Sequence, residues 1–393
     1  MKILIKNIDV VTDDGILKNA NCVVEDGIIL SVGYKKCLSD TVIDGSDCYL
    51  LAGFIDLHCH GGNGYDFMDA TAEQMLEIAE FHLKHGTTTL FATTMTDSWE
   101  NIEHSLKTYR SLFNENRLLT LTGVHLEGPW FSPEQCGAQD SANMELPSIS
   151  KIDELLAEYP FIKRVSMAPE LDGAIQVGNY AHKKGIVVSA GHTNADFDTI
   201  VKSSNNGFTL LTHFYSGMSG VVRKNAYRVA GAVEAGYYLD DMFVEIIADG
   251  RHLPVSLLKL IYKIKRADHI CLITDGTRGC GYEDGKEFML GRQKGGVRCI
   301  VDDGVAKLPD FSAFGGSIAT TDRLFRQMID AGVDIVDVSK MASATPAKIM
   351  GLSDRGVIEV GKRADLVIMD RHYRVKNVIT KGNLVFNDDC GNF

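Results

Sequence analysis

The sequence predicts an α/β fold in which a (β/α)8 barrel is flanked by two β-rich chain ends. From residue 51 to residue 352, apolar strand-like runs alternate with helical stretches, the pattern of repeated βα units around a parallel sheet. About eight such runs with intervening helices favour a closed barrel over an open doubly wound sheet. Residues 1–50 and 353–393 instead form short runs in which apolar and polar residues alternate.

The two chain ends are predicted to form antiparallel strands. In the first fifty residues, the turn dipeptides Asp14-Gly15 and Asp26-Gly27 separate the alternating runs, which is typical of a small meander. The C-terminal strands are predicted at 357–360, 364–369, 375–379 and 384–386. We therefore expect the barrel at 51–352 and the β-rich ends at 1–50 and 353–393.

The barrel elements follow in order along the middle of the chain. Helices are predicted, among others, at 72–84, 99–112, 174–184 and 255–265. The strand candidates are 51–57, 88–92, 118–126, 164–167, 186–190, 209–212, 243–248 and 269–274. No GxGxxG follows an early strand and no GxxxxGKS/T occurs, so dinucleotide-binding and P-loop folds lose their usual support.

Composition and charge narrow the possible functions. At 45% apolar and 23% charged residues, the chain has the composition of a globular protein. Its 40 Lys and Arg against 52 Asp and Glu give a net charge of −12, which argues against nucleic acid or an anionic membrane as a partner. No run approaches the roughly 18 apolar residues of a membrane span, and residues 1–22 lack a signal-peptide pattern. The nine scattered cysteines argue against a disulfide framework. We expect a cytoplasmic protein.

The first barrel strand is followed by two histidines, His58 and His60. Residues two apart in an extended chain point to the same side, so both imidazoles can face one metal ion. An HxH pair alone is weak evidence. Two strand-end histidines that hydrogen-bond to backbone remain the alternative.

The third strand ends in His125-Leu126-Glu127, followed by Gly-Pro. A carboxylate at the end of a buried strand needs a cation or hydrogen-bond donors to stay charged. Glu127 is therefore a candidate metal ligand, with a carboxylate held by loop amides as the alternative. His125 should face the same way, and we interpret it as a packed, hydrogen-bonded histidine.

Four later strands also end in His or Asp. Taken singly, each could be a turn residue or a structural histidine. Together they predict a pocket that holds a divalent cation with His, His and Glu and keeps one free Asp beside it. The four residues, in chain order, are His192, His213, His252 and Asp275.

These residues lie in motifs that identify a family. The motifs are GFIDLHCHGG at 53–62, HGTTTLFATTMT at 85–96, GVHLEGPWFSPEQCGAQ at 123–139, SAGHTNAD at 189–196, THFYSGMSG at 212–220, ADGRH at 248–252, ITDGT at 273–277, FGGS at 314–317 and VGKRADLVIMD at 360–370. With them the sequence resembles the amidohydrolase superfamily, and within it the N-acetylglucosamine-6-phosphate deacetylase family. That resemblance implies a metal-dependent barrel of TIM type and a small β-sandwich domain built from both chain ends.

The resemblance also implies roles for individual residues. Glu127, His192 and His213 would hold the principal metal, and His58 and His60 would complete a second site with Glu127 bridging. His252 would contact the sugar, Gln139 would lie in a substrate-facing loop, and Asp275 would be the acid and base. The cofactor would be one or two divalent ions per chain, with zinc ahead of iron, manganese or cobalt, which the same ligands accept.

The chemistry explains why an amide hydrolase needs these groups. A bound divalent ion lowers the pKa of water from 15.7 to about 7 and polarises the acetyl carbonyl. Asp275 would take the proton of that water and later deliver it to the sugar nitrogen. The implied reaction releases acetate and glucosamine 6-phosphate from N-acetylglucosamine 6-phosphate.

The segment that would hold the 6-phosphate departs from the family pattern. Where the family has THLYNAM, this chain has THFYSGM at 212–218. Ser216 and Gly217 thus replace the Asn-Ala pair, and they still offer backbone amides to a phosphate. The basic residues Arg223, Lys224 and Arg228 follow within a few positions and suit an anionic group. A solvated loop is the alternative for this cluster. In relatives this loop can reach a neighbouring subunit's site, so the resemblance implies a homodimer.

Three other functions stay open at this point. The substrate could be a different N-acetylhexosamine phosphate or an unphosphorylated sugar. The chain could be another amidohydrolase, such as an N-acyl-amino-acid deacylase, which would not need the basic cluster at 223–228. It could also be a metal-free sugar-phosphate binding or regulatory protein, although the retention of Glu127, His192, His213 and Asp275 argues against that.

Overall fold

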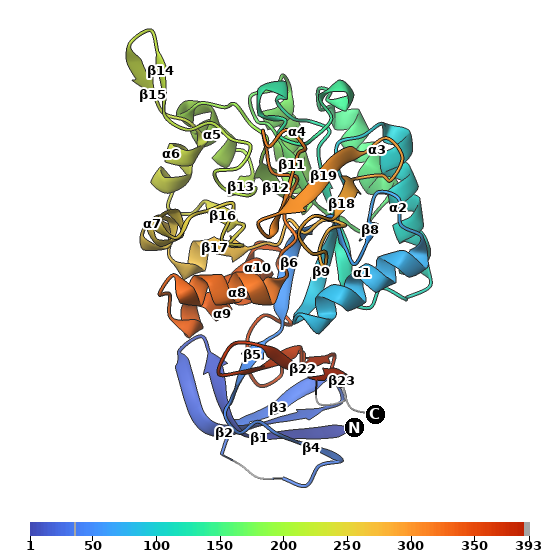
Figure 1. Ribbon diagram of the computed structural model, residues 1–393, viewed down its shortest axis with the longest axis vertical. Coiled ribbons are helices and arrows are strands. Elements are labelled where there is room, and N and C mark those ends of the chain that lie inside the picture. Colours follow the sequence, from blue (N-terminus) through green and yellow to red (C-terminus); the bar gives the residue numbers. More distant parts are fainter. Residues whose placement is uncertain (35–36, 389–393) are drawn as a thin grey trace.

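The computed structural model of the protein describes residues 1–34 and 37–388, and it consists of a helix-covered barrel and a separate sheet (Figure 1). Both chain ends run into the sheet, which lies below the barrel in Figure 1. Residues 389–393 of the predicted C-terminal segment, with Cys390, lie outside the described residues.

Eight parallel strands form the barrel, as the sequence predicted. They pair in chain order, and the parallel bridge between Cys59 and Gly276 links the last strand end to the first. The strands are β6 (Phe54–Cys59), β9 (Thr87–Thr93), β10 (Leu121–Glu127), β11 (Ile162–Met167), β12 (Val187–Ala190), β13 (Phe208–Leu211), β16 (Phe243–Ile246) and β17 (Ile270–Leu272). The expected (β/α)8 architecture is confirmed.

Helices surround the barrel (Figure 1). Those predicted from the sequence correspond to α1 (Ala72–Lys84), α2 (Trp99–Asn114), α4 (Ala174–Lys183) and α7 (Val255–Lys265). The others are α3 (Ile149–Glu158), α5 (Phe197–Ser204), α6 (Ala232–Tyr238), α8 (Thr321–Asp330), α9 (Ile335–Ala342) and α10 (Ala344–Ile349). None of the described helices is long and apolar enough to cross a membrane.

Helix α1 illustrates how local sequence sets these elements. Thr71 caps its first turn through a reciprocal pair of hydrogen bonds with Gln74, which satisfies two otherwise unpaired backbone N–H groups. Its buried side chains, among them Met75, Ile78 and Ala79, recur at helical spacing and pack into the core.

The separate sheet joins both ends of the chain, as expected, but the strand predicted at 357–360 is not formed. Its order is β23-β22-β21-β5-β1-β2-β3, with β4 beside β1. The strands are β1 (Lys2–Thr12), β2 (Gly15–Glu25), β3 (Ile28–Gly33), β4 (Thr41–Asp44), β5 (Cys48–Ala52), β21 (Leu366–Asp370), β22 (Val375–Thr380) and β23 (Asn383–Asn387). The pairs of β1 with β4 and β5 are parallel, so the N-terminal part is more than the predicted meander. The sheet has its own hydrophobic core.

One predicted strand, 51–57, is two strands in the structure. Strand β5 ends at Ala52 in the separate sheet, and β6 begins at Phe54 in the barrel. Gly53 stands between them, where an added Cβ would lie 2.2 Å from Thr88 Oγ1. The chain therefore passes from the separate sheet into the barrel at Gly53, a position where a side chain would collide with Thr88. The division of the chain at 50/51 and 352/353 stays a prediction.

Three small β elements decorate the barrel. They are the turn strands β7 (Gly61–Gly62) and β8 (Tyr65–Asp66), the hairpin β14 (Val222–Lys224) and β15 (Tyr227–Val229), and the sheet of β18 (Glu287–Leu290), β19 (Val297–Asp302) and β20 (Val305–Lys307). The hairpin projects from the upper left of the barrel in Figure 1. Short 3-10 turns lie at Pro133–Gln135, Ser141–Asn143 and Ala267–His269.

Candidate metal and active site

The predicted His, Glu and Asp side chains gather at the carboxyl ends of the barrel strands. All of them except His58 line one cavity of about 240 Å³, which suits a small molecule. Its lining includes His60, Glu127, Gln139, His192, His213, Ser216, Gly217, His252 and Asp275. The polar residues predicted at the strand ends thus form one part of the cavity lining, and apolar residues such as Met95, Leu290 and Phe314 form the rest.

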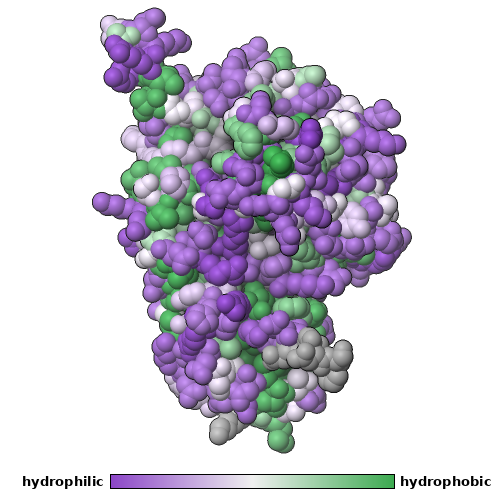
Figure 2. Space-filling model, in the orientation of Figure 1, coloured by the Kyte–Doolittle hydropathy of each residue, from purple (hydrophilic) through white to green (hydrophobic). Residues whose placement is uncertain are grey.

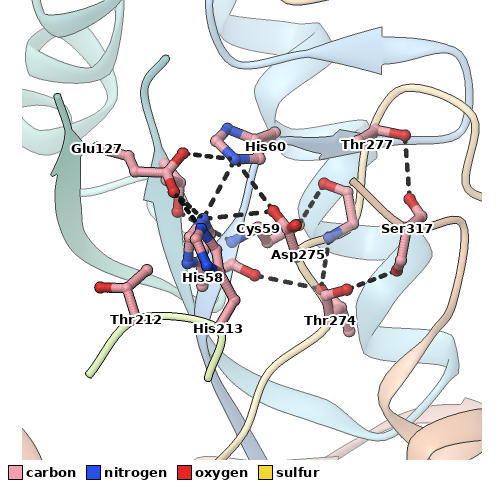
Figure 3. A network of polar contacts seen from close by, with 12 residues as sticks. His58, Cys59, His60, Glu127, Thr212, His213, Thr274, Asp275, Thr277 and Ser317 are labelled. Atoms are coloured by element: carbon pink, nitrogen blue, oxygen red, sulfur yellow. Dashed lines mark hydrogen bonds and ion pairs between the residues drawn. The ribbon is translucent and has the colours of Figure 1, made fainter. Parts of the chain in front are cut away.

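Glu127 lies at the centre of a cluster of imidazoles. Its Oε1 is 3.0 Å from His213 Nε2 and 3.4 Å from His192 Nε2. The same Oε1 lies 3.4 Å from His58 Nε2, and Oε2 lies 3.2 Å from His60 Nε2; Figure 3 shows the His58 and His60 rings facing Glu127. Two groups of potential ligands result, Glu127-His192-His213 and His58-His60-Glu127.

The hydrogen bonds of the distal ring nitrogens fit a divalent metal. His192 Nδ1 donates to the Gln135 carbonyl at 2.8 Å, and His213 Nδ1 donates to the Ser216 carbonyl at 3.0 Å. These bonds place the proton on Nδ1 and leave the Nε2 lone pair pointing at Glu127, as in a metal-ligating histidine. The Nε2 atoms of His58 and His60 also lie only 3.2 Å apart. A proton or a metal ion between these buried nitrogens satisfies their converging lone pairs, so the geometry accommodates a bound cation.

The carboxylates of the site are held in the ionised form. Burial opposes ionisation of Glu127, but the facing imidazoles, His58 first, keep its pKa well below the usual range. Burial likewise opposes the charge on Asp275, and His58 and His60 lower the pKa of that carboxyl. For His58 itself, the two carboxylates outweigh burial and raise its pKa to about 9. The site therefore combines strong negative charge with histidine donors, as a metal centre requires.

Asp275 follows β17 and points into the same cluster (Figure 3). Its Oδ1 lies 3.2 Å from His60 Nε2 and 3.4 Å from His58 Nε2. Its backbone N–H donates to the His58 carbonyl at 2.9 Å, and its carbonyl accepts from Ser317 N–H at 2.8 Å. The loop thus fixes this carboxylate beside the potential ligands.

Three of the site residues have left-handed backbone conformations. The φ angles are +44° at His192, +31° at His213 and +47° at Asp275. Non-glycine residues rarely adopt this region, and the strain concentrates at functional sites where the surrounding structure enforces it. The turn after each strand aims the side chain back over the barrel mouth.

A buried polar layer beneath the site was not predicted. Arg164 from β11 pairs with Glu245 from β16, and both side chains are fully buried. Arg164 also donates to Thr212 Oγ1 at 3.1 Å, and Glu245 Oε2 lies 3.7 Å from His58 Nδ1. No sequence pattern marks two charges 81 residues apart as a pair.

His125 belongs to the same layer. It is fully buried and hydrogen-bonded to Ser166 Oγ at 2.7 Å, and burial holds its pKa well below the usual range. The interpretation of His125 as a packed, hydrogen-bonded histidine is confirmed.

The predicted substrate-binding residues Gln139, Ser216 and Gly217 all line the cavity, but not all of their polar groups are available to a ligand. Gln139 lines the cavity, but its amide donates to Glu127 Oε2 at 2.7 Å and accepts from Thr96 N–H at 2.8 Å. Because both ends of the amide are used, Gln139 orients the central carboxylate, a role the sequence did not suggest. The Ser216 amide was expected to be available to a phosphate. In the structure its N–H already donates to the His213 carbonyl at 2.8 Å. Gly217 lines the cavity.

His252 lies where the sequence placed it, at the cavity wall. Its Nδ1 is 2.9 Å from Asp249 Oδ2, a contact that fixes the ring. Arg223 and Arg228 do not reach the cavity of their own chain. They lie on the exposed β14–β15 hairpin and are absent from the described residues that line the cavity.

Comparison with known proteins agrees with this geometry. N-acetylglucosamine-6-phosphate deacetylase of Bacillus subtilis (strain 168) is 33% identical over 98% of this chain and 97% of its own length. N-acetylgalactosamine-6-phosphate deacetylase of Escherichia coli O157:H7 is 29% identical over 85% of this chain and 87% of that protein. A solved variant of N-acetyl-D-glucosamine-6-phosphate deacetylase from Mycobacterium smegmatis, in complex with N-acetyl-D-glucosamine-6-phosphate, superposes with a TM-score of 0.90 at 27% identity, covering 98% of this chain and 100% of that one.

A family model extends these pairwise similarities. The model described as the amidohydrolase family matches residues 49–385, which include every strand of the barrel and every residue of the cavity. Since this match covers far more than half of the chain, the chain belongs to the amidohydrolase family.

Proposed function

We propose that this protein hydrolyses the N-acetyl group of N-acetylglucosamine 6-phosphate, giving glucosamine 6-phosphate and acetate. The observation that carries the proposal is the cavity lined by His60, Glu127, His192, His213 and Asp275. His58 is buried beside it, 3.4 Å from both carboxylates. The full-length similarity to the Bacillus subtilis deacetylase supports the same reaction.

Glu127, His192 and His213 are proposed to hold the principal ion, and His58 and His60 a second ion that shares Glu127. Zinc is the first choice for a site of imidazole and carboxylate ligands. When bound, such an ion acts as a Lewis acid toward the acetyl carbonyl and makes water more acidic. Gln139 keeps Glu127 in place through its 2.7 Å hydrogen bond.

Asp275 is proposed to move the proton. Its ionised carboxylate faces the cavity and can accept a proton from the attacking water at Oδ1. The water oxygen bonds to the acetyl carbon, the carbon–nitrogen bond breaks, and the proton passes from Asp275 to the departing amine nitrogen. One carboxyl group thus acts as base and then as acid, and His252 is proposed to contact the sugar.

The function is tested by measuring acetate release from N-acetylglucosamine with and without the 6-phosphate. We expect kcat/KM to be about 100-fold higher for the phosphorylated sugar, because charge-assisted hydrogen bonds to the phosphate contribute about 1.5–3 kcal/mol each. Complete chelation should abolish turnover, and readdition of Zn²⁺ should restore it. Equal rates with both sugars would contradict the phosphate-binding part of the proposal.

Metal analysis of the same preparations checks the ligand assignment. Two ions per chain are expected in the wild type, and one ion in a variant with both His58 and His60 replaced by asparagine. A wild type with a single ion would show that His58 and His60 do not form a working second site. Turnover that survives complete metal removal would contradict the proposed chemistry.

The hairpin is proposed to carry the phosphate contacts of a second subunit in a homodimer. Arg223 and Arg228 stand directly opposite each other on β14 and β15, and like charges in this position repel unless an anion lies nearby. Figure 2 shows the hairpin as a mostly hydrophilic protrusion from the body of the chain. Two copies that exchange hairpins would bring these guanidinium groups to each other's cavities.

An Arg228→Gln variant tests this arrangement. It should raise KM for the phosphorylated sugar about tenfold, since one charge-assisted contact is lost, and leave activity on the unphosphorylated sugar unchanged. Arg117→Gln removes an exposed arginine outside the hairpin and serves as the control. A wild-type mass of one chain, 43.1 kDa, in sedimentation experiments would refute the dimer.

N-acetylgalactosamine 6-phosphate is a second candidate substrate. It differs from N-acetylglucosamine 6-phosphate only in that its C4 hydroxyl group is axial. The Escherichia coli O157:H7 relative that is 29% identical carries the name of a deacetylase for that sugar. Comparing kcat/KM for the two phosphorylated sugars decides between the candidates.

A further inference from the structure

One wall of the cavity carries an aromatic side chain with an exposed face, Phe314. It lines the same cavity as Glu127 and Asp275, and 38% of its surface is accessible. Its ring centroid lies 4.7 Å from that of His252, which Asp249 holds in place. A large apolar ring left open to water inside a cavity of polar ligands indicates a surface that a ligand covers.

The backbone around Phe314 is fixed on both sides. Phe314 forms an antiparallel bridge with Lys307, the last residue of β20, and the Gly315 N–H donates to the Ala306 carbonyl at 3.0 Å. A Cβ at Gly315 would lie 2.4 Å from Cys299 Sγ, so the chain packs tightly against β19 here. The ring is therefore presented by a rigid segment.

The same segment is tied to the proposed proton-transfer residue. Ser317 N–H donates to the Asp275 carbonyl at 2.8 Å, and Thr277 N–H donates to the Ser317 carbonyl at 3.0 Å. The aromatic ring thus has a fixed position relative to Asp275. A ligand that lies against Phe314 is held in register with the proton donor and acceptor.

A second phenylalanine on the same loop has a different environment. Phe311 is 61% exposed, and Lys307 Nζ lies over its ring at 5.5 Å from the centroid. It is not among the described residues that line the cavity. The loop therefore presents two exposed rings, of which only Phe314 faces the ligand space.

We infer that Phe314 is a sugar-binding residue that receives the apolar C–H face of the hexose ring. This inference rests on the proposed function, because it names what contacts the sugar of the proposed substrate. A pyranose has hydroxyl groups around its rim and C–H groups on its faces, so one face can cover an aromatic ring while the rim stays free for hydrogen bonds such as those of His252. Covering both apolar surfaces removes them from water.

Kinetics of two variants test this inference. Phe314→Ala should raise KM for N-acetylglucosamine 6-phosphate about tenfold, and Phe314→Leu about threefold, with kcat within twofold of the wild type, because ring contact stabilises substrate and transition state alike. The inhibition constant of the product, glucosamine 6-phosphate, should rise by the same factors. Phe311→Leu and Phe311→Ala are the matched controls and should leave KM unchanged.

The possible outcomes separate the inference from the function on which it rests. If the wild type releases no acetate from the phosphorylated sugar, the proposed function is wrong. If the wild type is active and Phe314→Ala keeps KM and the product inhibition constant within twofold, the inference is wrong. Equal effects of the Phe311 and Phe314 variants would also overturn it. Phe314→Leu retains an apolar side chain, and an unchanged melting temperature and metal content identify variants that fold normally.

Discussion

Replacing Asp275 by asparagine should lower kcat about 10³-fold while leaving the metal content and the fold intact. General acid and base catalysis by a positioned side chain contributes about 10²–10⁴-fold to the rate, and Asp275 is proposed to act in both steps. Asparagine has the same shape, so the contacts of the backbone to His58 and Ser317 remain. It cannot take a proton from water at neutral pH or deliver one to the leaving nitrogen.

The measurement is steady-state acetate release together with metal analysis of the purified variant. Asp97→Asn is the matched control, because Asp97 is an ionised, half-buried carboxylate that binds Arg292 and does not belong to the described lining of the cavity. Its kcat should stay near that of the wild type. Turnover of Asp275→Asn close to the wild-type rate would refute the proton-transfer role.

The fold was predictable because barrel strands and helices leave local patterns. Apolar runs separated by helical stretches marked all eight strands, and strand-end polar residues marked the cavity, since the carboxyl ends of parallel strands meet at one edge. The split at Gly53 was not predictable, because two consecutive buried strands in different sheets read as one apolar run. The parallel pairs of β1 were missed because pairing partners depend on tertiary contacts.

In the site, too, some features were predictable from the sequence and others were not. Residue type and position identified Glu127 and the histidines, but not how side chains share hydrogen bonds. The sequence predicts that Gln139 faces the substrate, but in the structure Glu127 and Thr96 engage both ends of its amide. The basic cluster at 223–228 follows Ser216-Gly217 closely in sequence, but a hairpin carries it away from the cavity of its own chain.

Breaking the buried ion pair of Arg164 and Glu245 beneath the site should lower the thermal stability of the protein. Arg164 and Glu245 are both 0% exposed and bonded to each other, with Arg164 donating also to the Leu57 carbonyl and Thr212 Oγ1. Removing one partner of a buried ion pair leaves the other charge uncompensated, which costs about 3–5 kcal/mol. For a barrel of this size, Arg164→Met should therefore lower Tm by about 6 °C.

Two further variants distinguish charge compensation from packing. The double variant Arg164→Met, Glu245→Met removes both charges, so part of the lost stability should return, as it does when apolar groups replace a whole buried pair. Arg298→Met is the matched control: Arg298 binds Glu287 through two hydrogen bonds of 3.0 and 2.6 Å, but the pair is exposed to solvent, and Tm should hardly change. Thermal unfolding followed by circular dichroism gives all three values. A double variant that is less stable than Arg164→Met would mean that shape, rather than the unpaired charge of Glu245, sets the stability of the layer that supports His58.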